Sequence, residues 1–345
     1  MSETSKYSLA VVIPCWNEEK LLHEMLDCLL RQTYRDWVAF CVDDQSTDGT
    51  AAVIKDYQAK DARIQYVCRD REPKGGQTCR NIGLEKAAGA KYVCFFDADD
   101  LVAPYCFEQR VQFMETHPEL DCGVFPALAY AEDIHEENGP IFGVRIFEDD
   151  IQAMLNTNLC MTGWTNIYKV ASMRKYSISW DVNVKSMQDS DFSFQMLLSD
   201  MKYDFAKDAK ADYFYHVGND GVAKKIKTKR HYDSHLYCLD KISKAISAKY
   251  GSKYDFYIES RIVGFFGTFR GAWYPYFSIL RMPWMKHRWG FKMRILLYLM
   301  ILKKDRRLIF RKYRKYSKHQ NAIWAESMAK KRKELLALIS EGVNE

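Results

Sequence analysis

A unit of about 30 residues, repeated over the first hundred residues, constrains the fold of this chain most strongly. Apolar runs typical of β-strands begin near Leu9, Trp37, Ile64 and Tyr92. The segments between these runs place apolar residues at intervals of three and four, which is typical of amphipathic helices. The runs are apolar on both faces, as in strands that helices cover on both sides. The pattern predicts an α/β fold with a mainly parallel sheet flanked by helices.

Beyond residue 100 the pattern is less regular. We expect helices over 103–116, 148–156 and 187–199, and strands over 122–130, 141–147 and 211–217. From about residue 232 helical periodicity dominates. We therefore predict two parts, an α/β domain over residues 1–230 and a basic, aromatic-rich helical extension over residues 231–345.

The composition excludes several classes of protein. With 48% hydrophobic and 28% charged residues, the chain can bury a core and is not intrinsically disordered. Its ten cysteines form no CxxC pair, which indicates reduced, buried thiols in a cytoplasmic protein. The apolar run at 9–15 is too short for a signal peptide, and the longest other run, 295–302, is too short for a transmembrane helix. We expect a cytoplasmic protein that does not cross a membrane.

Positive charge is concentrated in the C-terminal part. Residues 281–345 hold 18 of the 51 Lys and Arg but only five of the 45 Asp and Glu. Over residues 271–318 these cations alternate with Trp and Tyr, which favour the membrane–water boundary, while Lys and Arg are attracted to anionic lipid. We prefer peripheral attachment to an anionic membrane surface, on the inner face of the cytoplasmic membrane. Binding of nucleic acid, or plain packing of the aromatic residues on the α/β domain, are the alternatives.

Acidic residues gather at the ends of the second and fourth predicted strands. In an open parallel sheet, ligands bind at the carboxyl ends of the strands. Five carboxylates follow these two strands: Asp43, Asp44, Asp97, Asp99 and Asp100. Such a cluster repels itself unless a cation is bound, and oxygen donors alone favour Mg²⁺ or Mn²⁺. The alternative is that these residues are ordinary turn residues and helix caps.

The nucleotide-binding signatures of other folds are missing. The first strand is followed neither by GxGxxG nor by GxxxxGK[ST], so neither a Rossmann nor a Walker site is indicated. The loop after the first strand instead offers Trp16 as a stacking surface, and Asp44 could accept a hydrogen bond from a base N–H.

Four motifs, in this order and spacing, resemble those of the family 2 inverting glycosyltransferases of GT-A fold. They are VIPCWNEE at 12–19, VDDQSTDGT at 42–50, CRNIGL at 79–84 and DADD at 97–100. The resemblance covers about residues 8–110 and resumes near 187–217. It implies a GT-A fold and a nucleotide-diphosphate sugar donor, in particular a UDP-sugar.

The resemblance also implies roles for single residues. Pro14, Trp16 and Glu18 would line the nucleotide pocket, and Asp44 would bind the base. Arg80 and the helix start at Gly75–Gly76 would face the diphosphate or the donor sugar. Asp97 would face the ribose and sugar, and Asp99 would hold a Mn²⁺ or Mg²⁺ ion that bridges the diphosphate.

Two further positions complete the implied site. The segment QDSDF at 188–192 has Gln where relatives usually have Glu, and its Asp189 matches the catalytic base. His216 matches a histidine that relatives place on the metal or diphosphate. The alternatives are that Asp189 and Asp191 are solvated helix residues and that His216 is structural. The basic loop 218–230 could be a mobile lid or simply a solvated loop.

The activity implied is transfer of a sugar from a UDP-sugar to a hydroxyl of a glycan, in particular a lipid-linked glycan acceptor in cell-surface polysaccharide synthesis. A polyprenyl-phosphate glycosyltransferase is the alternative within the family. A protein that binds a nucleotide or nucleic acid without catalysis is the alternative from another class. With the resemblance, no nucleic acid partner is expected. The replacement of a usual Asn by Pro73, and of a usual Ala by Cys79, leaves the details of the sugar pocket open.

Overall fold

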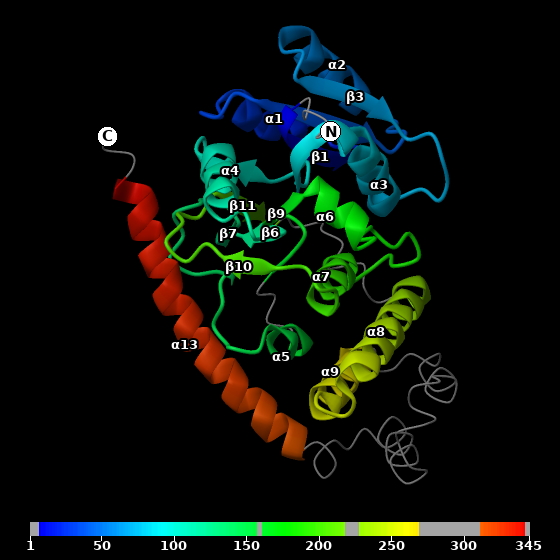
Figure 1. Ribbon diagram of the computed structural model, residues 1–345, viewed down its shortest axis with the longest axis vertical. Coiled ribbons are helices and arrows are strands. Elements are labelled where there is room, and N and C mark those ends of the chain that lie inside the picture. Colours follow the sequence, from blue (N-terminus) through cyan, green and yellow to red (C-terminus); the bar gives the residue numbers. More distant parts are fainter. Residues whose placement is uncertain (1–6, 157–160, 218–227, 269–310, 342–345) are drawn as a thin grey trace.

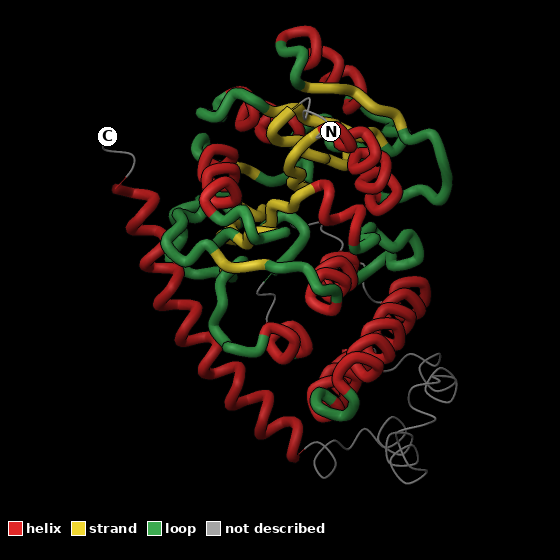
Figure 2. Tube along the Cα trace, in the orientation of Figure 1, coloured by secondary structure: helices red, strands yellow, loops and turns green. Residues whose placement is uncertain are grey.

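A computed structural model describes residues 7–156, 161–217, 228–268 and 311–341. Within these ranges the strands form a seven-stranded sheet, in the order β10-β6-β9-β4-β1-β2-β3, and a four-stranded sheet, in the order β5-β11-β7-β8 (Figure 2). The strands are β1 (Tyr7–Cys15), β2 (Trp37–Asp43), β3 (Ile64–Cys68), β4 (Ala90–Phe95), β5 (Leu101–Val102), β6 (Cys122–Val124), β7 (Ala127–Tyr130), β8 (Ile141–Phe142), β9 (Asn166–Lys169), β10 (Tyr203–Phe205) and β11 (Tyr213–His216).

The larger sheet is mainly parallel, as predicted. The four predicted apolar runs are β1 to β4; β1 pairs in parallel with β2 and β4, and β2 pairs in parallel with β3. Strands β6 and β10 are also parallel to each other, whereas β9 runs antiparallel between β4 and β6. The prediction of an α/β fold with a mainly parallel sheet is confirmed.

Helices cover both faces of this sheet (Figure 1). They are α1 (Leu22–Leu30), α2 (Thr50–Lys60), α3 (Gly76–Lys86), α4 (Cys106–Thr116), α5 (Asp150–Leu155), α6 (Val170–Lys175), α7 (Gln188–Leu198), α8 (Lys229–Tyr250), α9 (Asp255–Thr268) and α13 (Arg311–Glu341). Alternate residues of β1 point to opposite faces, so that Leu9, Val11 and Ile13 join the core beneath α1, α2 and α4. Ala10 and Val12 join the second core, to which α5 to α9 contribute.

Helix α3 approaches β1 closely. A Cβ atom at Gly83 would lie 2.2 Å from Cγ1 of Val12, which is far inside van der Waals contact. Close packing therefore requires the glycine of the CRNIGL motif, because only a residue without a side chain lets the helix that carries Arg80 lie directly on the strand.

Two predicted strands differ from the structure. The expected strand 122–130 is broken at Phe125–Pro126 into β6, in the larger sheet, and β7, in the smaller one. Proline has no N–H to continue a ladder, and this break lets the chain change sheets. The expected strand 141–147 extends only over Ile141–Phe142, since Gly143 takes a positive φ of 67° directly above the Phe125 carbonyl.

Helices α8 and α9 pack against the α/β part. Leu239 and Ile242 of α8 and Ile258 of α9 belong to the same core cluster as Phe192 of α7 and Phe95 of β4. The boundary near residue 230 coincides with the start of α8 at Lys229, and the division into two domains there stays a prediction.

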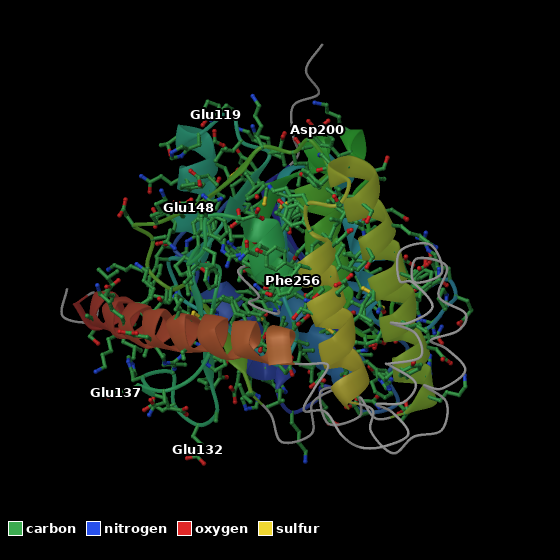
Figure 3. All side chains as sticks on the ribbon, turned by 90° about the horizontal axis from the view of Figure 1, so that it is seen from below. Glu119, Glu132, Glu137, Glu148, Asp200 and Phe256 are labelled. Carbon is green, nitrogen blue, oxygen red and sulfur yellow. The ribbon has the colours of Figure 1, made fainter. Side chains whose placement is uncertain are left out.

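The C-terminal helix α13 runs along one side of the molecule, against the smaller sheet (Figure 3). Its Met328, Leu335 and Ile339 share a core cluster with Leu128 of β7 and Phe214 of β11. We find no helix, within the described ranges, with the length and apolar character needed to span a bilayer. Part of the basic C-terminal region is thus a packed structural element.

Arg332 fixes α13 to the loop between β7 and β8. Its guanidinium is buried and donates hydrogen bonds to the carbonyl oxygens of Ala129 (2.9 Å), Glu136 (2.8 Å) and Pro140 (3.1 Å). The 131–138 segment is an acidic loop, and its Glu132 and Glu137 point into solvent (Figure 3).

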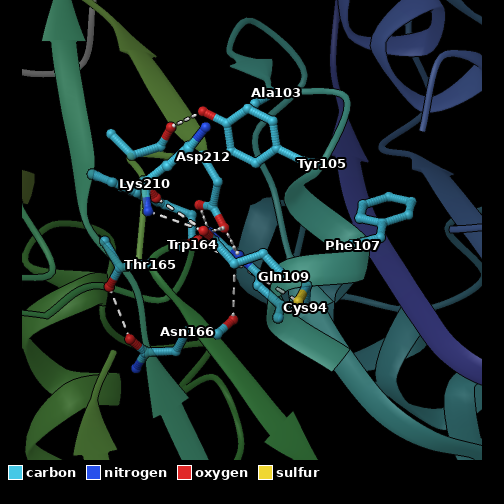
Figure 4. Close-up of polar contacts among 12 residues, drawn as sticks. Cys94, Ala103, Tyr105, Phe107, Gln109, Trp164, Thr165, Asn166, Lys210 and Asp212 are labelled. Atoms are coloured by element: carbon cyan, nitrogen blue, oxygen red, sulfur yellow. Dashed lines mark hydrogen bonds and ion pairs between the residues drawn. The ribbon is translucent and has the colours of Figure 1, made fainter. Parts of the chain in front are cut away.

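A buried ion pair connects helix α4 to the segment that leads into β11 (Figure 4). Arg110 of α4 and Asp212, just before β11, are fully buried and form two hydrogen bonds of 2.9 and 2.7 Å. Arg110 also donates to the Trp164 carbonyl at 3.0 Å, and Gln109 donates to Asp212 at 3.1 Å. This network fixes the position of Trp164, which borders the site described below.

We expect Asp212→Asn to lower the free energy of unfolding by about 3–5 kcal/mol, because removing one partner leaves the Arg110 charge buried and unpaired. Urea unfolding followed by circular dichroism measures this loss. Asp200→Asn is the matched control, since Asp200 pairs with Lys249 at the surface (3.2 Å, with the Asp200 side chain 90% exposed) and should change stability by less than about 1 kcal/mol. Equal losses in the two variants would contradict the buried pair.

Candidate functional site

The loops after β1 and β2 are tied together at the carboxyl edge of the larger sheet. The backbone N–H of Asn17 donates to the Ser46 hydroxyl at 3.0 Å, and that of Glu18 donates to the Thr50 hydroxyl at 2.8 Å. The Asn17 side chain in turn accepts from the Thr47 N–H at 2.9 Å. These bonds hold the first two sequence motifs together. The loops that follow β1, β2 and β4 at this edge of the sheet are called the rim below.

Asp44 is buried at the end of β2 and pairs with Arg69, which directly follows β3. Arg69 is also buried, and its other nitrogens donate to the Gln45 side chain (3.1 Å) and the Arg71 carbonyl (2.7 Å). Arg69 thus satisfies one oxygen of Asp44 and fixes the orientation of its carboxylate.

The acidic residues after β4 divide into two roles. Asp100 is buried and accepts hydrogen bonds from the Tyr213 hydroxyl and from the His216 N–H (2.7 Å), so it ties β4 to β11. Asp97 and Asp99 are only half-buried. Burial and the neighbouring charge of Asp97 raise the pKa of Asp99.

Glu18 faces the same acidic residues from the β1 loop. Burial, followed by the charges of Asp99, Asp48 and Asp97, raises the pKa of Glu18 to about 7. The end of β1 and the end of β4 therefore meet, as the strand-end rule predicts.

Arg80 of α3 connects this acidic rim to helix α7. Its buried guanidinium forms an ion pair with Asp97, donates to the Gln188 side chain at 3.3 Å, and lies 4.5 Å from the ring centroid of Trp180. Its charge also acts on Asp189. Gln188, which replaces the Glu usual in relatives, is thus a neutral acceptor for Arg80.

Asp189 lies beside Arg80 and Asp97 at the first turn of α7. A Cβ at Gly163 would lie 3.5 Å from its Oδ1, in ordinary contact, but only 2.5 Å from the Trp180 ring, so the glycine leaves room for Trp180. Burial raises the pKa of Asp189 to about 6; the Arg80 charge opposes this shift and the Asp97 charge adds to it. A carboxyl group of this pKa is ionised at neutral pH and can accept a proton.

Asp191 lies elsewhere, although it is only two residues away. It is buried and forms an ion pair with Lys241 of α8 at 2.8 Å, and it accepts from the Gln195 side chain at 2.8 Å. Of these two acids, Asp189 is therefore the one that faces the rim.

His216 and two tyrosines of β11 border the rim on the other side. The charge of His216 acts on Asp99, and its ring lies 5.3 Å from that of Tyr130. Tyr213 donates to Asp100, and its hydroxyl accepts the Asp97 N–H at 3.1 Å. Tyr215 is half-buried, and its ring is stacked on Trp164 at 5.5 Å with an interplanar angle of 4°.

Asp99 and its neighbours fit a divalent cation. The carboxylates of Glu18, Asp97 and Asp99 lie close enough to act on one another, and Arg80 pairs only with Asp97. Oxygen donors are the ligands that Mg²⁺ and Mn²⁺ prefer. The part of the chain that the structure describes contains no group of three or more His, Cys, Asp or Glu side chains that would enclose an ion by itself.

The remaining predicted positions lie close to this rim or outside the described residues. Pro14 lies under the start of α3, with its Cβ 4.0 Å from a Cβ built at Gly76. Trp16 is 48% exposed, with the Lys74 Nζ 4.5 Å from its ring centroid. The loop 218–230 falls outside the described residues up to 227, as does the 271–318 segment up to 310.

Sequence reasoning missed several residues at the rim. Arg69 directly follows β3, at the same edge of the sheet, so the rule that ligands bind at strand ends could have identified it. Gly163, Trp164 and Tyr215 come from an irregular loop and a four-residue strand, where the sequence carries no periodic signal.

Comparison with protein families gives a match for residues 10–176 to the model described as Glycosyl transferase family 2. The chain is 25% identical over 219 residues to a poly(ribitol-phosphate) beta-glucosyltransferase of Bacillus spizizenii, covering 62% of this chain and 33% of that protein. It is 29% identical over 229 residues to the minor teichoic acid biosynthesis protein GgaB of Bacillus subtilis, covering 64% of this chain and 24% of that protein. The chain thus spans about a third and a quarter of the length of these two relatives.

Two solved structures support the fold. S. aureus TarS 1–349 in complex with UDP-GlcNAc superposes with a TM-score of 0.58 at 17% identity, covering 85% of this chain and 81% of TarS 1–349. The mannosyltransferase PcManGT of Pyrobaculum calidifontis, in complex with GDP-Man and Mn²⁺, superposes with a TM-score of 0.51 at 15% identity, covering 95% and 88%. The described structure has the mixed α/β architecture of these GT-A proteins. Residues 10–176 thus form a domain that matches glycosyl transferase family 2.

Proposed function

We propose that this protein is an inverting, metal-dependent glycosyltransferase that moves a sugar from a UDP-sugar to a hydroxyl of a cell-surface polymer or its lipid-linked precursor. The observation that carries the proposal is the position of Arg80, which pairs with Asp97 of the strand-end rim and acts on Asp189 of α7. Arg80 thus links the carboxylates proposed to bind the donor to a carboxylate of raised pKa.

The nucleotide would occupy the loops after β1 and β2. Trp16 offers an exposed aromatic face, and Asp44, held by Arg69, offers a fixed acceptor for a base N–H. Pro14 and Glu18 would line the same pocket. The start of α3 at Gly76 has no side-chain cap, and its free N–H groups suit a phosphate.

Asp99 and His216 would hold a Mn²⁺ or Mg²⁺ ion together with diphosphate oxygens. When bound, the ion would neutralise the charge that develops on the leaving diphosphate. The neighbour solved with GDP-Man and Mn²⁺ supports the choice of a divalent ion.

Asp189 would act as the general base. An ionised carboxylate beside the donor sugar can remove the proton of the acceptor hydroxyl as its oxygen attacks the anomeric carbon. The ion pair of Arg80 with Asp97 keeps a cation next to Asp189, which favours its ionised form against the cost of burial.

The acceptor class rests on the relatives, whose printed names refer to poly(ribitol-phosphate) and to teichoic acid. Such polymers carry rows of hydroxyl groups. The experiment that follows therefore tests the use of a UDP-sugar as donor, which the residues of the rim support.

Release of UDP from a panel of UDP-glucose, UDP-GlcNAc and UDP-galactose with Mn²⁺ tests the proposal. We expect one of these donors to be turned over, and turnover to stop when EDTA removes the metal. Tight binding of a donor with no release of UDP under any of these conditions would instead support a nucleotide-binding protein without catalysis.

The 271–318 segment is proposed to attach the enzyme to an anionic membrane. We expect the full chain to co-sediment with phosphatidylglycerol vesicles at low salt, and to be released as salt rises, because surface charges are screened beyond about 8 Å at physiological ionic strength. Phosphatidylcholine vesicles are the control and should bind little. Equal sedimentation with both lipids, or no effect of salt, would contradict an electrostatic attachment. Deletion of residues 281–345 is not a clean test, since it removes the core residue Leu335 and the buried Arg332.

A further inference from the structure

Tyr215 of β11 has the features of a ligand-binding residue that no motif marks. The charges of Asp100, Asp97, Asp99 and Asp189 all act on its phenol group. On β11 it stands between Tyr213, whose hydroxyl accepts the Asp97 N–H, and His216, whose N–H binds Asp100. Its ring stacks on Trp164, which directly follows Gly163 next to the Asp189 carboxylate.

The ring of Tyr215 is fixed in place. It stacks on Trp164 at 5.5 Å and meets the edge of Phe142 at 5.9 Å. On the neighbouring strand β7 its partner is Ala129, whose small side chain leaves room for Trp164 on this face of the sheet. Arg110 donates a hydrogen bond to the Trp164 carbonyl at 3.0 Å, so the buried ion pair also fixes the backbone of the residue on which Tyr215 stacks.

The hydroxyl of Tyr215 is free, in contrast to that of Tyr213. Tyr213 lies two residues earlier on the same face of β11, and its hydroxyl is used by Asp100 and by the Asp97 N–H. For Tyr215 we find no hydrogen bond of the hydroxyl to any residue that the structure describes, and the ring is only half-buried. A rigid, half-buried ring thus carries an unused hydrogen-bonding group, as specific ligand sites require.

The position of Tyr215 selects one part of the substrate. In a direct displacement the anomeric carbon lies between the leaving diphosphate and the attacking hydroxyl, and hence between Asp99 and Asp189. Tyr215 directly precedes His216 on one side and stacks on Trp164, next to Gly163 and Asp189, on the other, so it would border the transferred sugar. We infer that the Tyr215 hydroxyl hydrogen-bonds a hydroxyl of the donor sugar and thereby contributes to the choice of donor. This inference rests on the proposed function.

Calorimetry of UDP and of UDP-sugars tests the inference. Each of UDP-glucose, UDP-GlcNAc and UDP-galactose is titrated with Mn²⁺, and the sugar that the wild type binds most tightly is used for the variants. We expect Tyr215→Phe to weaken binding of that UDP-sugar by about 3- to 10-fold, the usual effect of losing one neutral hydrogen bond. Binding of UDP should change by less than about 2-fold, because UDP has no sugar to contact.

Tyr57→Phe is the matched control. Its hydroxyl binds Asp27 at 2.7 Å on the helices α1 and α2, and its loss should leave both affinities unchanged. Since Tyr215→Phe keeps the stacked ring and removes a hydroxyl without a described protein partner, its urea midpoint should equal that of the wild type.

Deoxy analogues of the UDP-sugar identify the contacted hydroxyl. The analogue that lacks it should bind the wild type and Tyr215→Phe equally, because the two deletions remove the same bond. Equal weakening of UDP and UDP-sugar, or no weakening of UDP-sugar, would overturn the inference, as would a raised acceptor KM with unchanged donor affinity. Failure of the wild type to bind any UDP-sugar would instead contradict the proposed function.

Discussion

Asp189→Asn is expected to slow sugar transfer by about 10²–10⁴-fold, the usual contribution of a positioned general base. Donor binding should persist, because Arg80 remains paired with Asp97 when the neighbouring carboxylate becomes an amide. Transfer is measured as UDP release with acceptor, and donor affinity by calorimetry on the same preparation.

Asp191→Asn is the matched control for this variant. Asp191 pairs with Lys241, which also contacts Asp181 at 2.8 Å, so its loss should lower stability and leave transfer per folded molecule near that of the wild type. If Asp189→Asn kept more than about a tenth of the transfer rate and Asp191→Asn lost it, the base would be Asp191 and our assignment would be wrong.

The pH dependence of the wild type should report the same carboxylate. Burial raises the pKa of Asp189 to about 6, and only its ionised form accepts a proton. Transfer should therefore fall as pH decreases through about 6, while the residual activity of Asp189→Asn should lack this acidic limb.

Asp99→Asn is expected to abolish most of the metal-dependent binding of donor. Removing a residue that only supports a metal ligand already costs about 10- to 100-fold in affinity, so the loss of a ligand itself should exceed about 100-fold. The heat of UDP binding with Mn²⁺ should nearly vanish in calorimetry, and the weak binding without Mn²⁺ should be unchanged.

Asp56→Asn serves as the control for Asp99→Asn, because Asp56 is exposed on α2 and away from the rim. It should bind UDP with Mn²⁺ as the wild type does. Wild-type affinity in Asp99→Asn would remove this residue from the metal site.

The sequence predicted the half of the site that lies on regular elements. Long apolar runs alternate with amphipathic helices up to residue 100, so the ends of β1, β2 and β4 could be located, and the structure brings Glu18, Asp97 and Asp99 together there. Their roles in binding donor and metal stay predictions.

The other half of the site could not be derived from pattern. Strands β7, β8 and β11 lie within the predicted strands 122–130, 141–147 and 211–217, but they are only two to four residues long. The pattern did not indicate that they form a second sheet, because the break at Pro126 sends neighbouring residues into different sheets. Tyr215 and Trp164 meet only because this smaller sheet folds against the larger one.

Charge pattern alone also gave an incomplete account of the C-terminal region. Its cations include Arg332, which is buried and bonded to three carbonyl oxygens rather than exposed to lipid or solvent. A count of Lys and Arg does not distinguish such a structural arginine from a surface one, because the difference depends on which backbone carbonyls the fold places nearby.

The central claim, that Asp189 acts as the base of an inverting transfer, is tested most directly by the anomeric configuration of the product. With one general base, the acceptor oxygen displaces the diphosphate in a single step at the anomeric carbon, which inverts it. The wild type is incubated with Mn²⁺, the UDP-α-sugar that it turns over and an acceptor, and the new linkage is assigned by NMR. The account predicts a β-linked product, formed with inversion. A product that retains the α configuration would contradict it.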